Sequence, residues 1–164
     1  MKKILLMMLC MATGMSMYAQ KFGHIYSDSL LMAMPEKTAA EEKLRALAKQ
    51  YQDAIDQKDA EFSQKYQAYV ELDPNTPDII RADKEQELTR MQQGMQEFAV
   101  TMQNKLEEER ERLMTPVYEK ARVAIQSVAK DNGYTYVFDA STGVTLYEGG
   151  DNIINLVKAE LGIQ

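Results

Sequence analysis

The 164-residue chain has one cysteine, one histidine and no tryptophan. The cysteine, Cys10, lies in an N-terminal segment with the features of a leader, so the rest of the chain can form neither a disulfide nor a thiolate metal site. The histidine, His24, has no catalytic motif around it, and the chain lacks a glycine-rich phosphate loop and a serine nucleophile elbow. We therefore predict no enzymatic activity, no cofactor and no metal site.

Long apolar runs are also absent, apart from a short one at the start. Lys2 and Lys3 precede an apolar stretch over 4–12, and a mixed segment follows that ends at a plausible cleavage point after Ala19. This pattern is typical of a secretory signal peptide, and the stretch is too short to span a membrane. Cys10 is not preceded by the small residues that a lipid-anchored cysteine requires. We expect an exported protein, cleaved near Ala19, without stable membrane insertion.

Positive charge is scarce once the leader is removed. Seventeen basic side chains then face 25 acidic ones, for a net charge of about −8. This balance argues against nucleic acid as a partner and against simple attraction to anionic lipid.

What the chain does have is apolar residues spaced by three and four positions over 36–131, a spacing typical of a coiled coil. On the first helix these are Leu44, Leu47, Tyr51, Ile55, Phe62, Tyr66 and Tyr69; on the second they are Leu88, Met91, Met95, Phe98, Met102, Leu106, Leu113 and Val117. Between the two helices, Pro74 cannot continue the first, Thr76 suits an N-cap and Pro77 suits the first position of the second. The sequence predicts an antiparallel arm over 36–115 with its tip at 73–78.

Two residues are expected to interrupt the second helix, and a third to end it. Gly94 destabilises a helix interior, and Pro116 should kink or divide the helix where the arm meets a body. Gly133 can adopt the left-handed conformation that commonly ends a helix.

The remaining residues predict a small α+β body made of 20–35 and 116–164. We expect a strand at 22–26, a helical turn near 29–34, a hairpin of strands 134–139 and 144–147, and a last helix capped by Asp151. Such a sheet is marginal by itself, so several copies should pool their strands in a central barrel. The predicted oligomerisation residues are Phe22, Ile25, Tyr136, Val137, Phe138, Val144 and Leu146.

Methionine and aromatic residues form a stripe along the arm. They could simply be the seam between the two helices, or part of the stripe could remain open, because flexible Met side chains suit varied apolar partners. The two interpretations are compatible. The candidate binding residues are Phe62, Tyr66, Tyr69, Met91, Met95, Phe98 and Met102.

Taken in order, these features resemble the Skp/OmpH periplasmic chaperones of bacteria with two membranes, over essentially the whole chain after the leader. The matching segments are 25–29, 34–36, 116–120, 124–125, 128–129, 133–134, 136–139, 151–154 and 156–157. The resemblance implies a periplasmic homotrimer whose strands form a central barrel. Its arms would surround a cavity that holds unfolded outer-membrane proteins without ATP.

The chain departs from that family in the charge of its arm tip. Residues 66–90 carry three basic and six acidic side chains, whereas arm ends in the family are often basic. Client capture should therefore depend on apolar and aromatic contacts, and binding to lipopolysaccharide through the tip is not expected. The alternative function is a coiled-coil spacer or tether of the cell envelope, with the same helices and no client cavity.

Overall fold

The computed structural model describes residues 20–163, so the predicted signal peptide lies outside the described part. These residues form two compact units, an arm of 31–122 and a body of 20–30 with 123–163. The chain is mostly helical with one small sheet, as predicted. The elements are β1 (Phe22–Ile25), α2 (Ser27–Ala33), α3 (Pro35–Val70), α4 (Asp78–Asp131), β2 (Tyr136–Asp139), the 3-10 helix η1 (Ala140–Thr142), β3 (Asp151–Asn152) and α5 (Ile154–Leu161).

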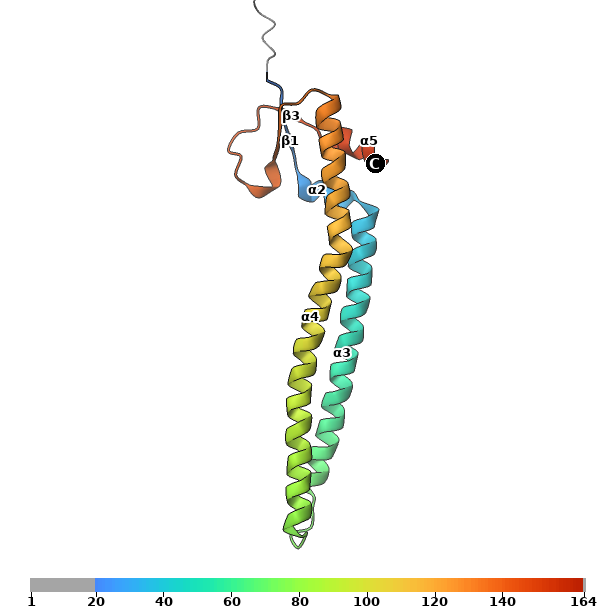
Figure 1. Ribbon diagram of the computed structural model, residues 1–164, viewed down its shortest axis with the longest axis vertical. Coiled ribbons are helices and arrows are strands. Elements are labelled where there is room, and N and C mark those ends of the chain that lie inside the picture. The colour runs from blue at the N-terminus through green and yellow to red at the C-terminus, as the bar shows by residue number, and fades with distance from the viewer. Residues whose placement is uncertain (1–19, 164) are drawn as a thin grey trace, which may run out of the picture. The chain divides into compact units, whose positions relative to one another are not determined.

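The arm is a hairpin of two long helices. Figure 1 shows α3 and α4 side by side and joined at one end by a short tip. Ion pairs link the helices at both ends of the arm, between Glu36 and Lys120 and between Lys65 and Glu87. A composition rich in Ala, Glu, Lys and Gln favours such helices, and the predicted helical hairpin is confirmed.

The tip follows the proline pattern of the sequence. α3 ends at Val70, and Pro74 and Pro77 lie in the turn that follows. The Asp73 side chain accepts a hydrogen bond of 2.7 Å from the Asn75 amide and so stabilises the turn, a contact that was not predicted. α4 begins at Asp78, one residue later than the predicted start at Pro77.

Pro116 was expected to kink or divide α4; division is wrong, and a kink at this position stays a prediction. The helix continues from Asp78 to Asp131 past both Gly94 and Pro116. A proline inside a helix costs about 3 kcal/mol through a lost hydrogen bond and a steric clash. Around Pro116 this cost is offset by packing, because Met114, Val117 and Ala121 on the same helix are buried.

The body contains a parallel sheet in the order β2-β1-β3. Phe22 lies beside Tyr136 and His24 beside Phe138, while Gly23 pairs with Asp151 on the other side of β1. The strands predicted near 22–26 and 134–139 are confirmed in slightly shorter form.

The predicted hairpin between 134–139 and 144–147 is wrong. The Asp139 carboxylate accepts a hydrogen bond of 3.0 Å from the Ser141 amide, which turns the chain into η1. Gly143 then ends η1 in the left-handed conformation, and 144–147 continues as a loop. The third strand is β3, which runs parallel to β1.

The ends of the body helices agree partly with the predictions. Gly133 has a φ of 69° beyond the end of α4, as expected. The last helix is confirmed as α5, but its cap is not Asp151, which lies in β3. Instead, the Asn152 side chain accepts a hydrogen bond from the Ile154 amide.

The body core consists of Ile25, Leu30, Ala124, Val128, Ala140, Ile153 and Val157.

Candidate interaction surfaces

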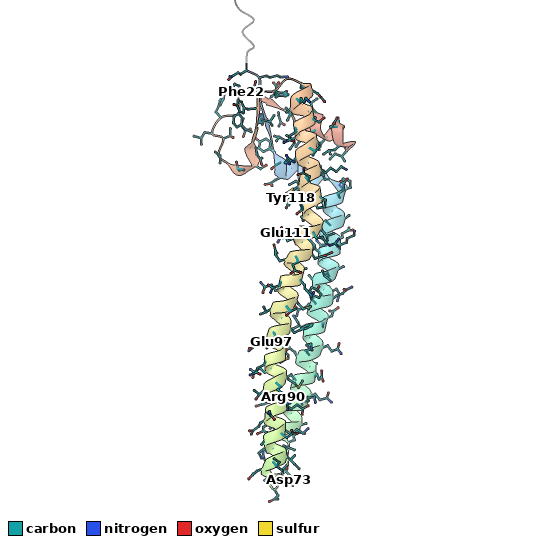
Figure 2. All side chains as sticks on the ribbon, viewed as in Figure 1. Phe22, Asp73, Arg90, Glu97, Glu111 and Tyr118 are labelled. Carbon is teal, nitrogen blue, oxygen red and sulfur yellow. The ribbon has the colours of Figure 1, made fainter. Side chains whose placement is uncertain are left out.

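An aromatic face covers one side of the body sheet. The register places Phe22 and Tyr136 side by side, and Phe138 follows two residues along β2, so all three rings lie on the same face. Each ring is stacked on the other two with centroids 6.1–6.4 Å apart, and all three side chains are exposed. Figure 2 labels Phe22 on β1. A contiguous exposed apolar face of this kind is typical of a protein–protein interface.

The loop over 143–150 exposes a second apolar group. Val144, Leu146 and Tyr147 are open to solvent, and Leu146 is 100% exposed. The loop is tied to the residue that follows β1, because the Tyr26 hydroxyl donates a hydrogen bond of 2.5 Å to the Glu148 carboxylate, which also raises the pKa of Tyr26. An exposed leucine in an anchored loop is suited to contact another molecule.

The predicted oligomerisation residues therefore separate into two groups. Phe22, Tyr136 and Phe138 of the aromatic face are exposed, as are Val144 and Leu146 of the loop. Ile25 is only 2% exposed and belongs to the core, and Val137 is half-buried and alternates with the exposed aromatics along β2. The role of all seven in assembly stays a prediction.

His24 is buried next to a polar group. Its Nε2 atom lies 3.5 Å from the Glu148 carboxylate, and its Nδ1 atom has no hydrogen-bond partner among the described residues. Within 20–163, no group of three or more His, Cys, Asp or Glu side chains is arranged to hold a metal ion. His24 is thus placed as a body side chain beside Glu148.

The seam of the arm is thin and partly open. Over residues 41–113 no side chain is fully buried. Of the candidate binding residues, six are half-buried and Tyr66 is 51% exposed. Two helices bury one face of each and leave the sides of the seam uncovered, so the six half-buried residues still present part of their apolar surface.

One hollow on the side of the seam brings three candidate residues together. Met91, Met95 and Phe98 line a hollow of about 370 Å³ together with Gly94. The other candidates do not line it: Phe62 stacks on Tyr66 with ring centroids 6.2 Å apart, Tyr69 donates a hydrogen bond to Glu85, and Met102 lies further along α4.

Apolar residues near the tip were not predicted as binding residues from the sequence. Ile79, at the start of α4, is 77% exposed, and Ile80 and Val70 are also exposed. Two adjacent isoleucines cannot both point into a two-helix seam, because neighbouring helical positions lie about 100° apart around the axis. This signal was present in the sequence. The tip is therefore apolar as well as acidic.

Comparison with known proteins assigns the chain to a family. The family model described as "Outer membrane protein (OmpH-like)" matches residues 21–161. The chain belongs to the OmpH-like family. Among curated proteins, none matches the sequence significantly.

A solved structure supports the fold of this OmpH-like chain. It is similar to the crystal structure of a candidate outer membrane chaperone (OmpH-like) from Caulobacter crescentus CB15, with a TM-score of 0.75. The identity is 15%, and the alignment covers 90% of this chain and 86% of the other. At this identity the likeness establishes the fold. No helix of the described residues is long and apolar enough to cross a bilayer.

Proposed function

We propose that this OmpH-like chain is an exported, ATP-independent holdase of the periplasm. It binds unfolded outer-membrane proteins in a cavity between the arms of a homotrimer and prevents their aggregation. Membership of the OmpH-like family and the two-helix arm support this proposal. The leader pattern over 1–19 supports export.

The observation that carries the proposal is the partly open seam of the arm. Met and aromatic side chains lie along its length, and none over 41–113 is fully buried. Each such side chain offers a small apolar contact, so an extended chain can be held at many weak points. Met adapts its shape to different partners, which suits clients of varied sequence. Weak contacts also allow release without a nucleotide.

The proposed trimer rests on the body. Its sheet has strands of four, four and two residues, and the outer edges of β2 and β3 have no further strand beside them in the described chain. Open edges and an exposed aromatic face both favour association with further copies. Three bodies would bury the aromatic face and pool their strands in a barrel.

The test combines a size measurement with a holding assay. Sedimentation of the purified chain without residues 1–19 should give three times the mass of one protomer. An unfolded β-barrel protein diluted from urea should stay in solution at about one trimer per client, as followed by light scattering. A monomer, or a trimer that leaves the client to aggregate, would favour the spacer or tether function.

A further inference from the structure

We propose that Gly94 keeps open a binding pocket on the arm that takes one neutral apolar side chain of a client. This pocket is the hollow on the side of the seam, called the seam hollow. The seam hollow is lined by Met91, Gly94, Met95 and Phe98 on α4 and by four charged residues, namely Glu87 and three α3 residues, which are called its rim. The proposal deepens the proposed holdase function and rests on it. It assigns the hollow a specific occupant: an apolar side chain of an extended segment.

The seam hollow is built from one face of each helix. On α3, Lys58, Glu61 and Lys65 follow one another at spacings of three and four residues. On α4, Glu87, Met91, Gly94 and Phe98 repeat at spacings of four, three and four residues, which places them on one face, and Met95 lies at the edge of that face. Figure 2 labels Arg90 and Glu97, between which Gly94 lies on α4.

Nothing in the fold of the arm requires glycine at position 94. Gly94 is helical and is not among the residues with positive φ. A Cβ atom added there would meet no atom within 4 Å, so crowding does not exclude a side chain either. Glycine destabilises a helix interior by about 1 kcal/mol relative to alanine. Gly94 therefore contributes no side chain to the hollow that it lines together with Met91, Met95 and Phe98.

The occupant is identified by the chemistry of the walls and rim. The walls contributed by Met91, Met95 and Phe98 are apolar and polarizable. The rim carries two lysines and two glutamates, and one of each is already joined in the Lys65–Glu87 ion pair. Lys58 lies 4.9 Å from the centroid of the Phe98 ring. A balanced rim attracts neither sign of charge, so the matching side chain is neutral and apolar.

The size of the hollow limits the occupant further. A volume of about 370 Å³ is at the lower end of the range for small-ligand sites. It accommodates a large side chain and does not accommodate a folded surface. Strands of outer-membrane barrels alternate apolar and polar residues, so an extended client presents an isolated apolar side chain at every second position. Such a segment matches one hollow with polar surroundings.

The test fills the hollow by steps. Gly94→Ala removes the backbone freedom of glycine and adds only a methyl group, while Gly94→Leu adds a side chain large enough to occupy the space. Both should raise the Tm of the arm, because Ala and Leu favour helices. Affinity for an unfolded β-barrel protein should change little with Gly94→Ala and fall about tenfold with Gly94→Leu, the loss expected for one large apolar contact. Gln93→Leu, on the neighbouring exposed position, is the matched control.

The outcomes are distinguishable. If the Gly94→Leu variant binds the client as tightly as the unaltered chain, the proposed binding pocket is overturned while the holdase function stands. If Gly94→Ala weakens binding as much as Gly94→Leu, the flexibility of the glycine backbone determines binding, and the proposed pocket is again overturned. If the unaltered chain does not hold the client, both the holdase function and the proposed pocket fail.

A second measurement locates the contact directly. Within residues 20–163 the methionines are Met32, Met34, Met91, Met95, Met102 and Met114, so a ¹³C-methyl spectrum has six resonances. The probe is a synthetic peptide of alternating phenylalanine and threonine with lysines at its ends. It should shift the Met91 and Met95 signals selectively, and Gly94→Leu should abolish these shifts. Shifts confined to Met32, Met34 or Met114 would overturn the assignment.

Discussion

The Ser27 hydroxyl donates a hydrogen bond of 2.5 Å to the Asp139 carboxylate, across 112 positions of sequence. The same carboxylate accepts from the backbone amides of Ser27 and Ser141. Ser27 is the first residue of α2, and Ser141 lies in η1, so one side chain satisfies donors at two helix starts and joins the ends of β1 and β2. Asp139 is a structural residue of the body.

Replacing Asp139 by asparagine should destabilise the body. The asparagine side chain lacks the negative charge of the carboxylate and places an N–H group opposite the donors of Ser27 and Ser141. We therefore expect a loss of about 1–3 kcal/mol in the free energy of unfolding. Denaturant unfolding at fixed protomer concentration measures this loss. Ser27→Ala should reproduce part of it.

The effect of Asp139→Asn should depend on pH. Burial raises the pKa of Asp139, but hydrogen bonds from Ser27 and Ser141 outweigh burial and hold the pKa below its usual value. A carboxyl with a lowered folded pKa stabilises the fold above the unfolded pKa of about 3.9, and this contribution is lost as pH falls through the folded pKa. The stability gap between Asp139→Asn and the unaltered body should persist down to about pH 4 and close below it. An equal gap at all pH values would contradict the role of the charge; Glu97→Gln on the arm is the control.

Polar substitution of the aromatic face should separate the copies. Tyr136→Ser with Phe138→Ser removes two exposed rings, so sedimentation should shift from the mass of a trimer to that of a single chain. Helical circular dichroism should be kept, because neither ring belongs to the buried core. Val123→Ser, at an exposed apolar position of α4 in the same unit, should leave the mass unchanged. A double variant that remains trimeric would exclude this face from assembly.

The exposed isoleucines of the tip should contribute to client holding. Ile79→Ser with Ile80→Ser should weaken binding of an unfolded β-barrel protein by about tenfold, the loss of roughly one large apolar contact. Stability should change by less than about 0.5 kcal/mol, since these side chains are exposed and Ile and Ser have similar helix propensities. Ala82→Ser is the control. Unchanged affinity would confine client contact to the rest of the arm.

The arm was predictable because its determinants are local. Apolar spacing defines the two helices, and prolines at 74 and 77 define the turn. Gly133 identified the end of α4 for a similar reason. The effect of Pro116 was not local: packing of Met114 and Val117 keeps the helix continuous, and burial of those residues cannot be read from a proline.

The body was less predictable because distant contacts decide it. Val144 to Tyr147 has strand-like composition, yet the Asp139 carboxylate turns the chain away from the sheet. The aromatic residues of the proposed interface were predicted from the sequence. Their stacking was not, because the contacts of Phe22 with Tyr136 and Phe138 depend on a parallel register that no short motif encodes. The sequence showed that Gly94 destabilises the helix. Only the structure shows that a Cβ atom added at this position would meet no other atom within 4 Å.

Client holding should be nearly independent of salt. The tip segment 66–90 has twice as many acidic as basic residues, and the rim of the seam hollow is balanced, so apolar contacts rather than charge should determine affinity. Raising NaCl from about 0.05 to about 0.5 M screens exposed charges strongly and should change client affinity less than about twofold. Asp78→Lys with Asp83→Lys is the matched variant, because it adds positive charge at the tip and should introduce salt dependence with an acidic client. A large loss of affinity in the unaltered chain at high salt would show that charge governs capture, against the apolar mechanism.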